Sequence, residues 1–235
     1  MRRRTVRNLQ RIFALISFLL VATIALLAGQ ALGLVPQDLL AFANPARLLP
    51  QRPQVALISG HAGYDSGAVC TDAADNVTLT EAEVNARVAD LAAQRLRRAG
   101  IDTLILEEYD PRLENLDAAL LLSLHADSCI ELTGYKAANR VSSSVPEEDG
   151  ILMACIEQHY AAATGLQPHP NTITHDMTAY HAFRRILPGT PAAILEMGFL
   201  GGDQNLLVNS ADSVAAGVAE SVACFLAEKE AMNED

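Results

Sequence analysis

Two histidines and two glutamates stand where structural segments of this sequence begin or end. His61 and His125 each come at the end of an apolar run, and Glu196 closes a third one. Glu81 stands in the first turn of a helical pattern, where it also fits compensation of the helix dipole. A carboxylate in a setting as apolar as that of Glu196 is costly to bury unless it is paired or lies near a metal. Glu196 is therefore the most informative of the four.

These residue types match one kind of catalytic metal site. Two imidazoles and one carboxylate bind catalytic zinc and leave a fourth position for water. Zinc lowers the pKa of that water, and a further carboxylate can take its proton and return it to a leaving amine. We therefore predict that His61, Glu81 and His125 bind one Zn²⁺ and that Glu196 is the general base and acid. Their wide spacing means that the fold must assemble the site.

The stretch at residues 55–68, VALISGHAGYDSGA, must position the first of these groups. Its first four residues are apolar and predict a buried strand. Gly60 and Gly63 allow the backbone to turn sharply where the strand ends. His61 is then expected at the carboxyl edge of a sheet, where open α/β folds place their ligands.

The rest of the sequence alternates between strand and helix patterns. Thr80 and Glu83 have the spacing of a capping box, and the helix that they open ends near Gly100. Further strands are predicted at 103–106, 118–125, 134–139 and 192–196, and further helices at 151–163 and 210–229. This alternation predicts a three-layer α/β fold, with a mostly parallel or mixed central sheet and helices on both faces.

The N-terminus combines a basic flank with a long apolar segment. The flank holds Arg2, Arg3, Arg4, Arg7 and Arg11. Residues 12–35 carry no charge and are numerous enough to span a bilayer as a helix, with the basic flank in the cytoplasm. We therefore predict a cytoplasmic tip and membrane anchor at 1–35, a proline-containing linker at 36–53 and one catalytic domain at 54–235.

Cleavage of the apolar segment is the alternative to an anchor. The small residues at 28–31, AGQA, would suit a signal peptidase, although the apolar run is longer than a usual signal core. Either way the domain leaves the cytoplasm. The expected localisation is the cell membrane with the domain outside, or secretion after cleavage.

The charge of the chain limits its partners. The formal net charge is −11, and the first 35 residues contain arginines but no acid, so the remainder is more acidic still. Such a surface disfavours nucleic acid and anionic lipid. We expect no nucleic-acid partner and contact with the cytoplasmic membrane only through the N-terminal helix.

Four cysteines lie in the part expected outside the cytoplasm, where disulfides form. Cys70 follows the loop of the first histidine and Cys129 lies shortly after the second, so a shared metal would bring these cysteines together. We predict a Cys70–Cys129 disulfide at the rim of the site, with two free buried thiols as the alternative. We do not pair Cys155 with Cys224, because both fall in predicted helices.

Four segments, in order, give the sequence a family resemblance. They are residues 60–68 (GHAGYDSGA), Glu81, residues 123–127 (SLHAD) and residues 196–200 (EMGFL). The sequence resembles the zinc-dependent N-acetylmuramoyl-L-alanine amidases of bacterial peptidoglycan turnover, which have Gly-His-Gly-Gly-x-Asp-x-Gly-Ala, a helix-opening Glu, Ser-x-His-Ala-Asn and Glu-x-Gly-Phe-Leu. The resemblance covers residues 55–207 and implies cleavage of the amide between N-acetylmuramic acid and L-alanine in peptidoglycan or muropeptides.

The sequence departs from the family pattern at several places. Ile58-Ser59 stands where Asp-Pro is usual, Ala62 replaces a glycine, and Asp127 replaces an asparagine. The connection at residues 107–116 is short and lacks the family's usual Arg and Ala-Asn pattern, which leaves one groove wall undefined. None of these changes removes a predicted zinc ligand, so the substrate contacts are less certain than the metal.

Two other functions compete with the amidase. One is a catalytically inactive module that binds zinc or peptidoglycan and regulates other wall enzymes; the presence of all four site residues favours the enzyme. The other is a different exported zinc hydrolase such as a carboxypeptidase, whose short His-x-x-Glu ligand pair is absent from this sequence. His175 and His181 could line a cleft, but a surface loop is the favoured interpretation for each.

Overall fold

The computed structural model describes residues 11–18, 20–25 and 54–234. Its contacts divide the chain into two units, residues 1–51 and residues 52–235, and each unit is described by itself. In the first unit, residues 11–18 and 20–25 are helical. No helix among the described residues has both the length and the apolar character needed to cross a bilayer. The predicted span also includes residues 19 and 26–35, which lie outside the described residues, as does the linker.

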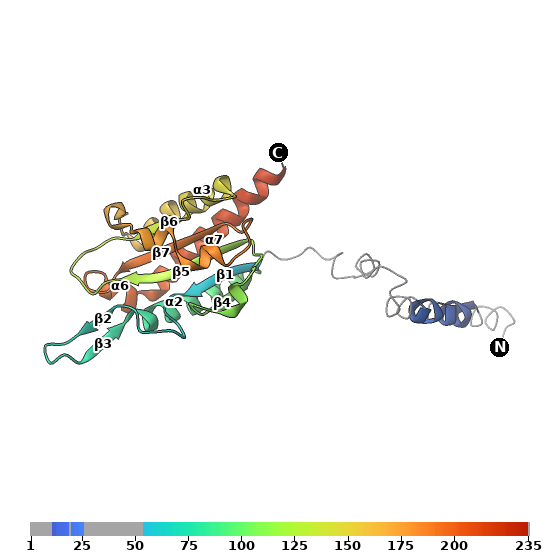
Figure 1. Ribbon diagram of the computed structural model, residues 1–235, viewed down its shortest axis with the longest axis horizontal. Helices are drawn as coiled ribbons and strands as arrows, with labels where there is room; N and C mark the ends of the chain where they lie inside the picture. The colour runs from blue at the N-terminus through green and yellow to red at the C-terminus, as the bar shows by residue number, and fades with distance from the viewer. Residues whose placement is uncertain (1–10, 19, 26–53, 235) are drawn as a thin grey trace. The chain divides into compact units, whose positions relative to one another are not determined.

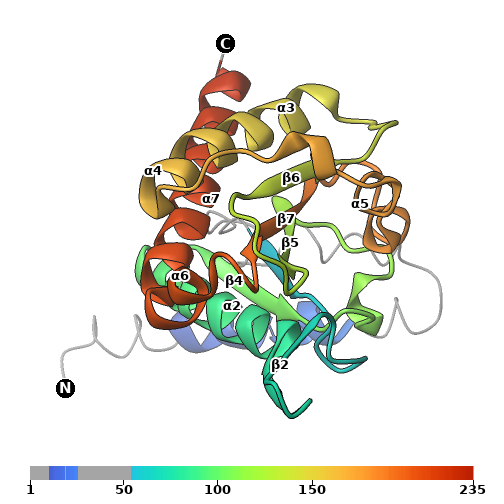
Figure 2. The same ribbon diagram turned by 90° about the vertical axis from the view of Figure 1, so that its left-hand side faces the viewer.

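A five-stranded sheet forms the centre of the second unit (Figure 1). Its strands, in spatial order, are β4 (Asp102–Leu106), β1 (Gln54–Ser59), β5 (Leu120–Asp127), β7 (Ala192–Phe199) and β6 (Lys136–Asn139). The first four run parallel, and only β6 is antiparallel to its neighbour. The predicted mixed sheet is confirmed. Because β1, β5 and β7 are parallel, their carboxyl ends share one edge, which faces the viewer in Figure 2.

Long helices cover one face of this sheet. Helix α2 (Glu81–Arg98) packs against α7 (Ala211–Glu234), and α3 (Pro146–Cys155) lies beside α7 as well (Figure 2). A π-helical turn at Ile156–Tyr160 leads from α3 into the short α4 (Ala161–Thr164). The predicted helix over 151–163 is thus one helical region with a π-turn inside it.

Short turns cover the other face. They are the 3₁₀ helices η3 (Pro111–Leu113) and η6 (His181–Arg184) and the one-turn α5 (His175–Thr178), whereas the 3₁₀ helix η5 (Pro170–Thr172) lies beside β6. A second cluster of buried apolar residues lies beneath them, including Leu121, Phe183 and Ile194. The three layers are confirmed, but one of the outer layers consists of single turns. The remaining helix, α6 (Gln204–Asn209), joins β7 to α7.

The capping box that the sequence predicts opens α2. The Thr80 side chain accepts a hydrogen bond from the Glu83 amide at 3.3 Å, and the Glu83 carboxylate accepts one from the Thr80 amide at 3.3 Å. This pair satisfies amide groups that a helix start would otherwise leave unpaired. It also fixes the direction of the first turn, which carries Glu81.

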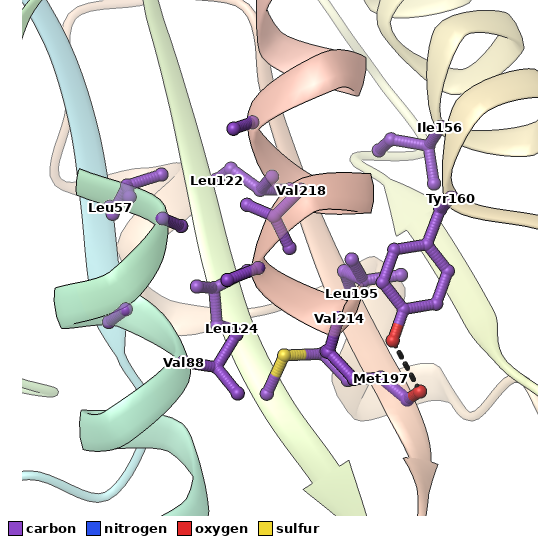
Figure 3. Close-up of a cluster of buried hydrophobic side chains, with 14 of the residues drawn as sticks. Leu57, Val88, Leu122, Leu124, Ile156, Tyr160, Leu195, Met197, Val214 and Val218 are labelled. Atoms are coloured by element: carbon purple, nitrogen blue, oxygen red, sulfur yellow. Dashed lines mark hydrogen bonds between the residues drawn. The ribbon is translucent and has the colours of Figure 1, made fainter. Parts of the chain in front are cut away.

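The larger core lies between the sheet and the long helices (Figure 3). Leu57 and Leu122 from adjacent strands are fully buried, as are Val88 of α2 and Val218 of α7. The hydroxyl of Tyr160 donates to the Met197 carbonyl at 2.5 Å, so this buried polar group has a partner. Burial of these side chains supplies the main driving force that holds the carboxyl edge of the sheet in place.

A short hairpin, which we did not predict, lies between the His61 loop and α2. It consists of β2 (Val69–Thr71) and β3 (Val77–Thr80), which pair in antiparallel orientation. The Asp72 carboxylate accepts hydrogen bonds from the amides of Ala74 and Asn76 and closes the turn. Strands of three and four residues with exposed side chains carry too little apolar alternation for sequence analysis to detect.

All four cysteines are paired in two disulfides. The predicted bond joins Cys70 to Cys129, with the two Cα atoms 5.3 Å apart, and ties the hairpin to the segment after β5. The second joins Cys155 to Cys224 with a Cα separation of 5.8 Å, so our decision not to pair them was wrong. A position in a helix does not prevent pairing, because α3 and α7 pack side by side.

We expect the Cys155–Cys224 bond to stabilise the domain appreciably. It closes a loop with a sequence separation of 69 residues, which restricts the unfolded chain. Replacing both cysteines by alanine should lower the free energy of unfolding by about 2–4 kcal/mol. Urea unfolding of the double variant against the oxidised wild type measures this loss. An unchanged midpoint would show that the bond contributes nothing.

Candidate metal and catalytic site

The loop after β1 holds His61 in an unusual backbone conformation. His61 has φ 65° and Gly63 has φ 74°, whereas Ala62 is not among the residues with positive φ. The replacement of a family glycine by Ala62 therefore causes no backbone strain. Gly60 is required for a different reason: a Cβ there would lie 2.4 Å from Cε1 of the His125 ring. The bare Gly60 backbone lets the two histidines approach each other.

The three predicted zinc ligands converge. Nε2 of His61 lies 3.2 Å from Oε2 of Glu81, and Nδ1 of His125 lies 3.0 Å from Oε1 of the same carboxylate. One ligand atom from each residue can be chosen so that all lie within 4.8 Å of one another. Within the described part of the chain, no other cluster of at least three such groups meets this criterion.

Neighbouring groups orient these side chains. Oδ1 of Asp65 lies 2.5 Å from Nδ1 of His61 and also accepts the amide of Gly67. The Asn85 side chain donates to Oε1 of Glu81 at 3.3 Å and to the Gly60 carbonyl at 3.1 Å. Outer partners of this kind fix the ring orientation of metal-binding histidines.

The electrostatics of the cluster keep the carboxylate ionised. Burial alone would raise the pKa of Glu81, but hydrogen bonds with His125 and His61 outweigh it and lower that pKa. The hydrogen bond to Glu81 is the main cause that raises the pKa of His61 to about 9, against the opposing effect of burial. An ionised carboxylate between two imidazoles is a site where a metal cation can take the place of bound protons.

Glu196 lies one strand away from His125. The two residues are register partners on β5 and β7, and Lys136 of β6 is the register partner on the other side. Oε2 of Glu196 is buried and has no hydrogen-bond partner. Burial raises the pKa of Glu196 to about 7, while the charge of His125 opposes the rise. A carboxyl group that titrates near neutrality beside the three predicted ligands is suited to accept and return a proton.

Lys136 does not neutralise Glu196, because it has other partners. Its ammonium group forms a close ion pair with Asp127 and donates to the Thr172 carbonyl at 3.3 Å. Asp127, which replaces the family's asparagine, is thus engaged with a lysine. The charge of Lys136 lowers the pKa of Glu196 only as a lesser effect, and burial of Glu196 dominates.

Sequence analysis missed Glu108, a buried carboxylate at the same site. Oε2 of Glu108 accepts the His61 amide at 2.8 Å and lies 3.6 Å from Nε2 of His125. Oε1 accepts the Tyr180 hydroxyl at 2.7 Å and lies 2.7 Å from Nε2 of His181. These contacts, led by that with His181, outweigh burial and lower the pKa of Glu108 to about 2. Nothing in the sequence distinguishes Glu108 from the adjacent Glu107, which is exposed.

The two undecided histidines have different positions. His181 belongs to the Glu108 cluster, with 17% of its side chain exposed, so the surface-loop interpretation was wrong for it. His175 is exposed and lines a cavity of about 770 Å³ together with Arg140, Arg184 and Tyr180. His175 therefore lies outside the cluster that surrounds the predicted ligands.

The raised pKa of Glu196 leads to a prediction for the metal-free protein. The Glu196 carboxyl group is protonated more readily in the folded protein than in the unfolded chain. Its favourable contribution to the stability of the protein is therefore present below about pH 4.5 and is lost as the pH rises through about 7. Relative to Glu196→Gln, the wild type should lose about 3 kcal/mol of stability across this range. Denaturant unfolding of both proteins at a series of pH values tests this. If the stability of the two proteins changed with pH in the same way, the pKa of Glu196 would be close to its ordinary value.

Comparison with known proteins agrees with this geometry. The sequence profile of the N-acetylmuramoyl-L-alanine amidase family matches residues 55–224. A search of curated proteins gives no match. Among solved structures, an N-acetylmuramoyl-L-alanine amidase from Clostridium difficile 630 is similar, with a TM-score of 0.59 and 18% identity, over 77% of this chain and 100% of that one.

Two further amidases share the fold. The catalytic domain of CwlV from Bacillus (Paenibacillus) polymyxa var. colistinus has a TM-score of 0.57 and 23% identity, over 74% of this chain and 98% of that one. Ami1 from Mycobacterium smegmatis has a TM-score of 0.59 and 14% identity, over 75% and 97% of the two chains. The structural likeness supports the fold, and the match to the family profile covers more than half of the sequence. The chain belongs to the N-acetylmuramoyl-L-alanine amidase family.

Proposed function

We propose that this amidase is zinc-dependent, with His61, Glu81 and His125 as the metal ligands and Glu196 as the general base and acid. The observation that carries the proposal is the convergence of the three ligand groups within 4.8 Å, with an unpartnered buried carboxylate on the adjoining strand. The reaction is hydrolysis of the amide between N-acetylmuramic acid and the L-alanine of the stem peptide.

The residues present fit zinc. Two imidazoles and one carboxylate are a donor set of catalytic zinc sites, and Glu81 is ionised as a ligand must be. Asp65 holds Nδ1 of His61, which leaves Nε2 facing Glu81. The set of three leaves room for a fourth ligand, as catalytic sites do and structural sites do not.

Each residue then has a defined part in hydrolysis. Zinc at this position would polarise the amide carbonyl and lower the pKa of an attacking water. Glu196, which is ionised in part near neutral pH, accepts the proton that the water loses. The protonated Glu196 then donates that proton to the amine of the departing L-alanine. Its apolar surroundings make the protonated form accessible, which the second step needs.

The test of this function is direct. The domain at residues 54–235 should bind one equivalent of zinc, and mass spectrometry of digested peptidoglycan should show free stem peptides that begin with L-alanine. Zinc binding without release of peptides would favour the regulatory binding module instead. The intact set of four residues and the family match argue against that module.

We also propose that the domain works outside the cytoplasm, held by the N-terminal segment. The arginine flank and the uncharged residues 12–35 support this topology. Two disulfides fit an oxidising compartment. Protease added to intact spheroplasts should degrade the domain and spare the N-terminus. Complete protection of the domain would refute this topology.

A further inference from the structure

We propose that Tyr64 and Tyr109 form a stacking surface that binds a sugar ring of the glycan strand beside the metal site. The inference deepens the proposed function and rests on it, because it names where the saccharide side of the substrate lies.

The two rings are exposed next to each other. Tyr64 is 65% exposed and Tyr109 is 49% exposed, whereas the other three tyrosines of the sequence are buried. The ring centroids of Tyr64 and Tyr109 are 4.6 Å apart, in an edge-to-face arrangement. Tyrosine rings are enriched at binding interfaces, because each offers a large apolar face and a polar hydroxyl group.

Both rings are attached to the metal site. Tyr64 lies in the His61 loop, and its amide donates to the His61 carbonyl at 3.0 Å. Tyr109 stacks on the His181 ring at 4.2 Å with an interplanar angle of 23°. His181 is held by Glu108, whose other oxygen accepts the His61 amide. This support holds the Tyr109 ring in place before substrate arrives, which lowers the entropic cost of binding.

The charges around the rings favour a neutral ligand. Asp65 is the next residue after Tyr64, and a Cβ at Gly63 would lie 2.4 Å from Oε2 of Glu107. Arg185 also acts on Tyr109, but the charges of Glu108 and Asp65 act on it more strongly. The carboxylates of a stem peptide would be repelled here, whereas the N-acetylated sugars of the glycan are neutral. The C–H groups on one face of a pyranose carry partial positive charge and pack against the electron-rich face of an aromatic ring.

A carboxylate has a better location elsewhere on the domain. The cavity that Tyr180 lines also contains Arg140, Arg184 and His175, and no acidic residue lines it. Arg140 is partly engaged with the buried Asp149 at 3.7 Å. The guanidinium group of Arg184 donates to the Ala179 carbonyl and remains exposed. The surface of Tyr64 and Tyr109, with the carboxylates of Asp65 and Glu107 nearby, therefore suits the saccharide rather than the peptide.

A pair of substrates with the same scissile bond tests the assignment. One is an N-acetylmuramoyl peptide, and the other is the corresponding D-lactoyl peptide, which lacks the sugar. In the full-length protein, Tyr109→Ala and Tyr64→Ala should each raise KM for the first substrate about tenfold and leave KM for the second unchanged. Tyr109→Phe and Tyr64→Phe should behave like the wild type, because the ring is kept. Val77→Ala, which removes exposed apolar surface from the hairpin, is the control and should change neither KM.

Binding of a peptide-free glycan gives a readout independent of catalysis. Isothermal titration calorimetry of the full-length protein reports the titration of an oligomer of N-acetylated sugars, and its signal does not depend on the two tyrosines. The Tyr64→Ala/Tyr109→Ala double variant should bind at least about tenfold more weakly than the wild type. Equal binding, or an equal loss of activity on the sugar-bearing and lactoyl substrates, would overturn the proposal. If the wild type binds the glycan but cleaves neither substrate, the proposed function fails and the glycan site remains.

Discussion

Replacing Glu196 by glutamine should lower the rate of amide cleavage at least roughly 10²-fold while the protein still folds and binds zinc. Glutamine keeps the shape of the side chain but cannot accept a proton from water. Glu196 has no hydrogen-bond partner at Oε2 and contributes no atom to the Glu81 cluster, so neither folding nor the metal requires its charge. The loss should appear in kcat, because proton transfer belongs to the chemical step.

Three measurements distinguish this role from others. Metal analysis shows whether zinc remains, circular dichroism shows whether the fold remains, and product analysis gives the rate. Glu131→Gln is the matched control, since Glu131 is exposed and should tolerate the same change. Near-normal cleavage by Glu196→Gln would show that another group is the base. Loss of zinc would instead place Glu196 among the ligands.

Replacing His125 by alanine should abolish both zinc binding and activity. His125 is buried, so no other side chain can readily replace its contact with Glu81. We expect less than about a tenth of an equivalent of zinc after reconstitution. Activity should fall at least roughly 10³-fold, because metal chemistry worth several kcal/mol of barrier is lost.

The matched control for this change is His159→Ala, which removes a half-buried imidazole of the π-helical turn, outside the cluster. It should retain full zinc content and activity. Removal of the metal from the wild type by a chelator, followed by addition of zinc, should reproduce the loss and then restore activity. Full activity of His125→Ala, or of the chelated wild type, would exclude a zinc mechanism at this site.

The fold class and the position of the candidate site residues were largely predictable because their signals are local. Apolar runs of four to eight residues predict buried strands, and the polar residue that closes each run must then lie at a sheet edge. His61, His125 and Glu196 each follow this rule, and Thr80 with Glu83 fixes where α2 begins. The family resemblance added the assignment of roles and the substrate.

Other features were invisible because they depend on contacts between distant segments. Glu108 stands in an acidic stretch, and only the packing of η6 beside it brings His181 and Tyr180 to its carboxylate. The sequence near Glu196 shows no basic residue, yet Lys136 is its register partner across the sheet. Only the structure shows that Asp127 engages this lysine.

The amino-acid sequence by itself determined the alternation of strands and helices, the parallel core of the sheet and the four residues of the proposed chemistry. These features follow from apolar periodicity and from the cost of burying a charge, both of which act within a short segment. The tertiary structure alone decided the Cys155–Cys224 bond, the Glu108 cluster and the exposed pair Tyr64 and Tyr109. Each of these results from the packing of segments far apart in sequence, and side-chain pairing across such distances leaves no periodic signal in the chain.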